Sequence, residues 1–213
     1  MHPMGYRKKG YKKATHVKGS AMVIAKKALT AVKILKSKSA NELKQNTQVL
    51  KNGQVTLAGE VQYMIRISQG DAIEEREANQ VKLKSFQFSG YLFWNTSGNI
   101  NQNARLWIVK DTQTISDSSP VFTDIFDNND VNSFPEVRTK GRFKIVKSIF
   151  FERNADVTQK HIEFNIAASD IVRWNGVGQT DIQKNHYYLV MVTNLAINCP
   201  VFFIKCRTNY YDN

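Results

Sequence analysis

The chain has 213 residues, of which 42% are hydrophobic and 11% aromatic, enough for one globular domain with a buried core. Its formal net charge of +12 indicates a polyanionic partner, such as nucleic acid or an anionic membrane surface. The two cysteines, Cys199 and Cys206, are too few for a disulfide framework, so we expect buried free thiols in a reducing compartment.

The positive charge is concentrated in residues 1–41, which hold eleven basic residues and no Asp or Glu, whereas the rest of the chain has 19 basic and 18 acidic residues. A block of like charge repels itself and is typical of an interaction tail. A solubilising or ribosomal-type extension would also have nucleic acid as its partner. The residues predicted to bind nucleic acid are Arg7, Lys8, Lys9, Lys12, Lys13, Lys18, Lys26, Lys27, Lys33, Lys36 and Lys38.

Residues 1–19 mix Lys, Gly and Tyr without hydrophobic periodicity, so we expect them to be disordered without a bound partner. Tyr6 and Tyr11 alternate with lysines and are suited to stacking on bases, but we favour the interpretation that their placement is incidental. The run GYRKKGYKK also resembles a nuclear localisation signal.

A basic amphipathic helix is predicted over about residues 20–36, with Ser20 as its N-cap. Four interspersed lysines exclude a signal peptide or a membrane span. An isolated helix of this length is marginally stable in water. Its apolar stripe must therefore meet another copy of itself, a membrane or the inside of a shell. The stripe consists of Ala21, Ile24, Ala25, Ala28, Ala31, Val32 and Leu35.

After a polar linker that runs to about Gln54, the chain takes up the two-residue hydrophobic alternation of half-buried strands. The hydrophobic phase shifts between Leu83 and Phe86, which indicates a β-bulge near Ser85. Residues 187–192 are apolar at every position, which predicts a central strand. The predicted strands include residues 63–67, 81–84, 105–109, 142–151, 162–166, 186–193 and 201–211.

This pattern gives seven or eight strands joined by long connections, such as residues 70–80 and 112–140, with almost no helical pattern in the body. An antiparallel sandwich is the natural class, and long connections favour Greek-key or jelly-roll topology over tight meanders. We therefore predict an all-β, eight-stranded antiparallel jelly roll over residues 54–213. Residues 1–53 form the basic arm and linker.

Side-chain clusters typical of enzymes are absent from the sequence pattern. His161 and His186 lie in separate strand-start contexts, and the His-x-His or Glu-x-x-His spacing of a metal oxygenase or cupin site is absent. We find no nucleophile elbow, phosphate-binding glycine loop or zinc-like cysteine pairing, so we expect neither an enzyme nor a cofactor. Asp124, Asp127 and Asp130 could hold a structural Ca²⁺ ion, but we favour their interpretation as turn formers after one helical turn.

Residues 61–95 read VQYMIRISQGDAIEEREANQVKLKSFQFSGYLFWN. This segment resembles the B and C strands of satellite tobacco necrosis virus-like capsid proteins, a type found in many circular single-stranded DNA viruses. Ala78 stands where that family commonly has glycine, so we expect a different turn before the following strand. The residues that match the family pattern are Gln69, Gly70, Arg76, Val81, Leu83, Lys84 and Ser85.

Later segments follow the order of the same family, so the resemblance covers nearly the whole body. The chain closes with two segments similar to the last two strands, NHYYLVMVTN and FIKCRTNYYDN, the second of which holds Arg207, Tyr211 and Asp212. Residues 104–114, 120–130 and 142–152 resemble the D strand, the short helical insertion after it and the next strand.

The resemblance implies a capsid protein that assembles as sixty copies in a T=1 icosahedral shell, with the N-terminus facing inward. Sixty arms would then bring about 660 positive charges to a similar number of phosphates. It also implies viral single-stranded DNA as cargo and a location in the virion, and the GYRKKGYKK run adds the host nucleus as a location and nuclear import receptors as partners. The alternatives are a cellular nucleic-acid-binding β-sandwich module, a jelly-roll enzyme and a membrane-active helix fused to a lectin-like domain.

Overall fold

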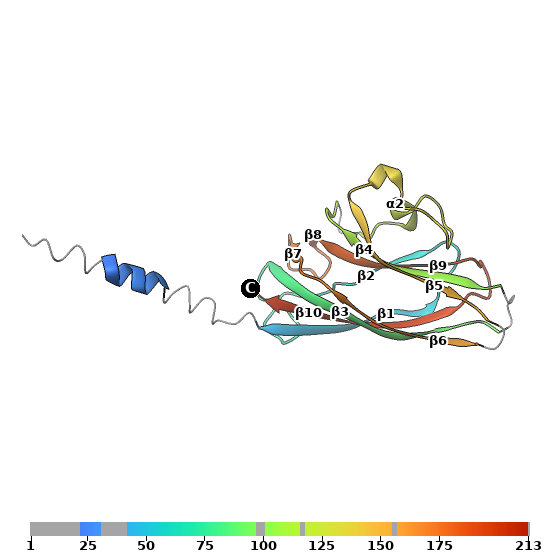
Figure 1. Cartoon of the computed structure of the whole chain (residues 1–213), viewed down its shortest axis with the longest axis horizontal. Coiled ribbons are helices and arrows are strands. Elements are labelled where there is room, and N and C mark those ends of the chain that lie inside the picture. The colour runs from blue at the N-terminus through green and yellow to red at the C-terminus, as the bar shows by residue number, and fades with distance from the viewer. Residues whose placement is uncertain (1–21, 31–41, 97–100, 116–117, 155–156, 213) are drawn as a thin grey trace, which may run out of the picture. The chain divides into compact units, whose positions relative to one another are not determined.

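A computed structural model describes residues 22–30, 42–96, 101–115, 118–154 and 157–212 (Figure 1). The chain divides into two compact units, Met1–Ala40 and Asn41–Asn213. In the first unit, residues 22–30 form a helix, in which the Thr30 hydroxyl donates a hydrogen bond to the Lys26 carbonyl (2.9 Å). This helix lies within the predicted span, whose remaining residues fall outside the described ones.

The described residues of the second unit form ten strands, one α-helical turn and one 3₁₀ turn. In chain order the elements are β1 (Leu43–Gln54), β2 (Glu60–Tyr63), β3 (Gln80–Phe93), β4 (Asn103–Asp111), α2 (Phe122–Ile125), η1 (Val137–Thr139), β5 (Phe143–Glu152), β6 (Gln159–Ala167), β7 (Ile171–Trp174), β8 (Ile182–Lys184), β9 (His186–Thr193) and β10 (Val201–Asp212).

The strands form two antiparallel sheets that pack face to face as an all-β sandwich (Figure 1). The six-stranded sheet has the order β1-β10-β3-β7-β8, with β6 also paired to β3, and the four-stranded sheet has the order β2-β9-β4-β5. The predicted all-β sandwich is therefore confirmed. The strand number differs from eight because β6 and β7 pair with successive parts of β3 and the short strand β8 is added beyond β7.

Strand β9 explains why part of the sequence is apolar at every position. All eight of its residues are buried, and it lies between β2 and β4, so the predicted central strand is confirmed. Leu189 and Met191 point into the core between the sheets. Tyr188 and Val190 belong to a second apolar cluster on the opposite face.

This second cluster forms because the connection between β4 and β5 folds over the outer face of the four-stranded sheet (Figure 1). Within it, the rings of Trp107 on β4 and Phe126 are 4.4 Å apart, and Phe122 of α2 lies 5.0 Å from Phe126. Full burial of side chains of this size contributes roughly 1.5–3 kcal/mol each. One outer face of the sandwich is thus covered by the body itself.

Two expectations about strand positions are wrong. Residues 43–54 form strand β1 along the length of β10, whereas the sequence indicated a polar linker there. As an edge strand, β1 keeps one row of backbone groups in solvent and fully buries only two side chains, those of Lys44 and Leu50, so few apolar residues mark it. Conversely, β2 ends at Tyr63; Ile65 and Ile67 are fully buried in the core but continue no strand.

The predicted bulge in β3 is confirmed. The register between β10 and β3 shifts between Asn209, which faces Ser85, and Tyr210, which faces Leu83. Lys84 is thereby left without a partner in the register. The extra residue keeps Leu83 and Phe86 both turned into the core, as the phase shift in the sequence required.

Candidate nucleic-acid interface

Two of the eleven basic residues assigned to nucleic-acid binding, Lys26 and Lys27, lie in the described helix of residues 22–30 and are exposed. The apolar side chains of this helix are exposed as well, with Met22 at 64% and Ile24 at 65%. Such a short helix needs a partner surface to be stable. The others lie outside the described residues: Arg7, Lys8, Lys9, Lys12, Lys13, Lys18, Lys33, Lys36 and Lys38.

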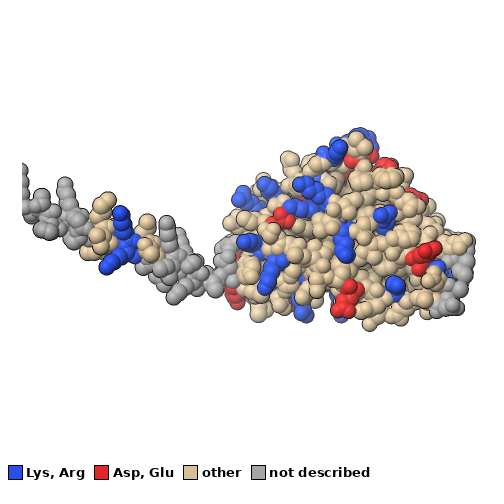
Figure 2. All heavy atoms as spheres, viewed as in Figure 1, with Lys and Arg blue, Asp and Glu red and all other residues tan. Residues whose placement is uncertain are grey.

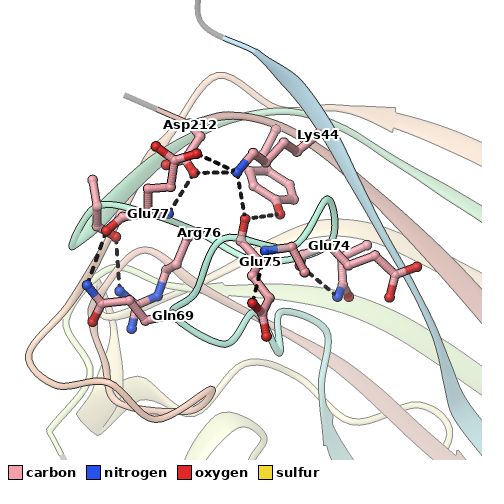
Figure 3. Close-up of polar contacts among 11 residues, drawn as sticks. Lys44, Gln69, Glu74, Glu75, Arg76, Glu77 and Asp212 are labelled. Carbon is pink, nitrogen blue, oxygen red and sulfur yellow. Dashed lines mark hydrogen bonds and ion pairs between the residues drawn. The ribbon is translucent and has the colours of Figure 1, made fainter.

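Lys44 is buried at the start of β1, only three residues beyond the basic segment (Figure 3). Its Nζ lies 3.1 Å from a carboxylate oxygen of Glu77 and 3.2 Å from one of Asp212. It also donates to the carbonyl of Glu75 (3.2 Å). Burial alone would lower the pKa of Lys44, but the hydrogen bonds and charges of Glu77 and Asp212 outweigh it and raise that pKa.

Arg76 organises the loop that supplies Glu75 and Glu77, whereas Asp212 lies at the end of β10. Its side chain is fully buried, with the guanidinium 4.5 Å from the ring centroid of Trp174. It donates hydrogen bonds to the carbonyls of Ala78 (2.9 Å) and Gly176 (2.7 Å), and the Gly70 amide donates to the Arg76 carbonyl (3.0 Å). The motif residues Gly70 and Arg76 therefore shape the loop whose Glu75 and Glu77 accept hydrogen bonds from Lys44 at the start of β1 (Figure 3).

Sequence reasoning missed Lys44 as a structural residue, since it placed this lysine in the linker. Nothing in the local sequence distinguishes Lys44 from the other lysines near it, because its partners Glu77 and Asp212 are distant in the chain. The buried position follows only from the pairing of β1 with β10, in which Lys44 faces Tyr210.

The acidic loop does not bring its three carboxylates together around an ion. Asp124 accepts a hydrogen bond from the Val121 amide (2.9 Å) at the start of α2, Asp127 accepts from Phe134 (3.0 Å), and Asp130 accepts from Asn132 (2.6 Å). These are the local bonds of turn formers. Among the described residues no group of three or more His, Cys, Asp or Glu side chains could hold a metal ion.

The histidines and cysteines of the body lie in separate environments. His186 is buried with its ring stacked 4.6 Å from that of Tyr188; burial, aided by the charge of Arg66, lowers its pKa to about 3. His161 is exposed beside Glu163 (3.9 Å). Burial raises the pKa of the Cys206 thiol to about 12, so this thiol stays protonated and unreactive at neutral pH.

The surface of the body carries basic and acidic side chains interspersed, with the basic ones spread more widely over the face in view (Figure 2). No helix within the described parts of the chain is long and apolar enough to cross a membrane. No protein-family model matches the chain, and no curated protein matches it at a significant level.

Proposed function

We propose that this chain is a viral capsid protein whose β-sandwich body forms a closed shell and whose basic N-terminal arm packages the genome. The observation that carries the proposal is the separation of charge. Residues 1–41 hold eleven cations and no acid, while the body has 19 basic and 18 acidic residues. A nearly neutral body can pack against copies of itself without strong repulsion, and the cationic arms can neutralise phosphate inside.

The strand order supports a jelly-roll body, an architecture common in viral capsids. In a jelly roll the eight strands, numbered in chain order, form one sheet with the order 1-8-3-6 and another with 2-7-4-5. If β6 and β7 count as one interrupted strand and β8 as an addition, the two sheets β1-β10-β3-β6/β7 and β2-β9-β4-β5 have that arrangement. Lectins and cupins share it, so the fold alone does not select a capsid.

Exposed apolar side chains supply a surface for self-association. Val121, Phe134 and Val137, all on the connection between β4 and β5, are 60%, 74% and 78% exposed. A shallow groove lined by Ile125, Val137 and other residues lies beside them. Apolar groups gathered on one segment favour contact with another protein surface, and further copies of this chain are the partner in a shell.

In the assembled particle the arms would face inward and bind single-stranded DNA through phosphate contacts, independent of base sequence and sensitive to salt. The helix of residues 22–30 would pack its apolar side chains against neighbouring arms. Sixty copies in a T=1 shell, a location in the virion and the host nucleus, and recognition of GYRKKGYKK by import receptors complete the proposal.

Deletion of residues 1–38 tests the packaging role. We expect the shortened chain to form particles that hold far less nucleic acid than those of the full chain, measured as the ratio of absorbance at 260 and 280 nm after nuclease treatment. Retention of nucleic acid at the level of the full chain would contradict the role of the arm. A monomeric chain that binds nucleic acid but never forms particles would favour the alternative, a cellular nucleic-acid-binding β-sandwich module.

A further inference from the structure

The two outer faces of the sandwich differ in how far they are covered: one is buried beneath a long connection, and the other keeps many side chains in solvent. The four-stranded sheet is covered by the connection that contains α2. On β3 and β10, at the centre of the six-stranded sheet, every second side chain stays exposed or partly exposed over much of the strand. Because these two strands are neighbours in register, their exposed side chains form one continuous surface.

We call this surface the β3–β10 face. It is defined by the outward side chains of the two strands, which are Lys82, Lys84, Gln87, Ser89, Tyr91, Phe93, Phe203, Lys205, Arg207 and Tyr211.

This face carries four cations, Lys82, Lys84, Lys205 and Arg207. It is therefore positively charged, although the body as a whole is nearly neutral. Lys205 faces Ser89 and Arg207 faces Gln87, while Lys82 faces Tyr211. Within the described residues, none of the four lies within ion-pairing distance of a carboxylate. Their charges are therefore available to an external anion.

One carboxylate borders the face from β6. Glu163 stands in register with Ser89, and its side chain is 75% exposed and lies 3.9 Å from His161. A single exposed acid leaves the face strongly cationic.

Aromatic rings are interleaved with these cations. Lys84 lies 5.8 Å from the ring centroid of Tyr211, and Lys205 lies 5.4 Å from that of Phe203. Tyr91 is 38% and Phe93 41% exposed, with their rings 5.9 Å apart. Exposed rings on a pleated sheet, beside cations, form the kind of platform on which unpaired bases stack.

The dimensions fit a strand of nucleic acid. From Phe203 to Tyr211 the face extends eight residues along β10, or about 27 Å at the rise of an antiparallel strand. Besides Glu163, a shallow hollow in the middle is lined by Lys205 and Arg207 and by the polar side chains of Thr47, Gln87 and Asn165. These groups can donate hydrogen bonds to phosphate and base edges, and Arg207 Nε already donates to Thr47 Oγ1 (3.3 Å).

We infer that the β3–β10 face is a second nucleic-acid site, which binds single-stranded DNA or RNA by phosphate contacts to its four cations and by stacking on its aromatic residues. The inference rests on the proposed function for the identity of the cargo. Unpaired bases suit this face better than a duplex, because a duplex hides the base surfaces that the rings would contact. The body thereby fixes part of the packaged strand instead of only enclosing it.

The test uses the full chain and a fluorescent 20-nucleotide oligothymidylate, with affinity measured by anisotropy over a series of salt concentrations. The face variant carries Lys82→Gln, Lys84→Gln, Lys205→Gln and Arg207→Gln. The control variant carries Arg138→Gln, Lys140→Gln, Lys144→Gln and Lys160→Gln, which remove the same charge from other exposed positions of the body.

We expect the face variant to bind about tenfold more weakly than the control variant at physiological salt. Its slope of log affinity against log salt should be smaller by up to about 3, from loss of four phosphate contacts at about 0.7 each. A further variant, Tyr91→Ala with Phe203→Ala, should weaken binding roughly tenfold with an unchanged salt slope, since stacking involves no counterion release. If folding of the quadruple variant is impaired, Lys205→Gln and Arg207→Gln alone should each weaken binding about two- to threefold.

Equal affinity of the face and control variants would overturn the inference and leave the role of the arm intact. Loss of particles in electron micrographs of the face variant, with oligonucleotide affinity equal to that of the control, would overturn it as well and assign the face to a contact between copies. Failure of the unaltered chain to form particles would instead contradict the proposed function, whatever the oligonucleotide result.

Discussion

At the scale of single residues, His186 makes the stability of the body depend on pH. It is fully buried, and its pKa is lowered from an ordinary 6.5 to about 3. Between these two values the unfolded chain binds a proton that the folded chain excludes, so the free energy of unfolding decreases as the pH falls from about 6.5 toward 3.

The substitution His186→Phe should remove this contribution while keeping an aromatic ring beside Tyr63 and Tyr188. From about pH 7 to about pH 5 we expect the unaltered chain to lose about 2 kcal/mol more than the variant. Urea unfolding of the dissociated chains at both values measures the difference. An identical loss in the two proteins would show that His186 is protonated as readily in the folded body as in the unfolded chain.

The burial of Lys44 likewise predicts a measurable change in the free energy of unfolding when this residue is replaced. Lys44→Met leaves the carboxylate of Asp212, which is only 6% exposed, without its cation, and we expect a loss of about 3 kcal/mol in the free energy of unfolding. Lys51→Met is the matched control, because Lys51 pairs with a more exposed partner, Glu60, and its removal should cost about 1 kcal/mol. Equal losses in urea titrations would contradict a structural role for the Lys44 pair.

The raised pKa of Lys44 also leads us to expect that the stability of the body decreases at alkaline pH. Its folded pKa is raised above the ordinary 10.5, so the stabilisation is fully present below that value and is lost as the pH rises through the folded pKa. The unaltered chain should therefore lose more stability than Lys44→Met above about pH 10.5, a comparison for urea titrations at high pH.

At the scale of elements, strand β1 sets the boundary of the body. Deletion of residues 1–38 should leave the melting temperature nearly unchanged, whereas deletion of residues 1–54 removes β1, exposes the edge of β10 and takes Leu50 from the core. We expect the longer deletion to abolish cooperative thermal unfolding, measured by circular dichroism. A cooperative transition in its absence would mean that β1 belongs to the arm.

The connection between β4 and β5 carries the proposed contact between copies. Phe134→Ser with Val137→Ser should prevent particle formation at neutral pH without lowering the melting temperature, because both side chains are more than 70% exposed and contribute little to the core. Ile73→Ser with Ile197→Ser, equally apolar and exposed on other loops, serves as the control in size-exclusion chromatography. Normal particles from the first variant would exclude this contact surface.

The elements that could be predicted from the sequence are those whose own pattern of apolar and polar residues shows which side chains are buried. Strand β9 is apolar from Tyr187 to Val192 because both of its faces are covered, and the bulge in β3 is visible as the phase shift around Lys84. Strand β1 and the β3–β10 face could not be predicted from the sequence. The first is a polar edge strand, and the second exists only because β3 and β10, more than a hundred residues apart in sequence, lie side by side.

At the scale of the whole molecule, the protein has two kinds of cationic segment, the N-terminal arm and the β3–β10 face. The arm supplies eleven basic residues within 41 positions of the chain, whereas the β3–β10 face supplies four, placed beside aromatic rings by the pairing of two strands. Charge alone makes binding sensitive to salt, whereas stacking persists when phosphate contacts are screened.

The central claim is that the purified full chain closes into uniform shells around nucleic acid. Negative-stain electron microscopy of the recombinant chain, purified under non-dissociating conditions, tests it most directly. The account predicts round particles of one small diameter, with nuclease-resistant nucleic acid inside. A monodisperse monomer with no closed particles over a range of salt concentrations and pH values would contradict it.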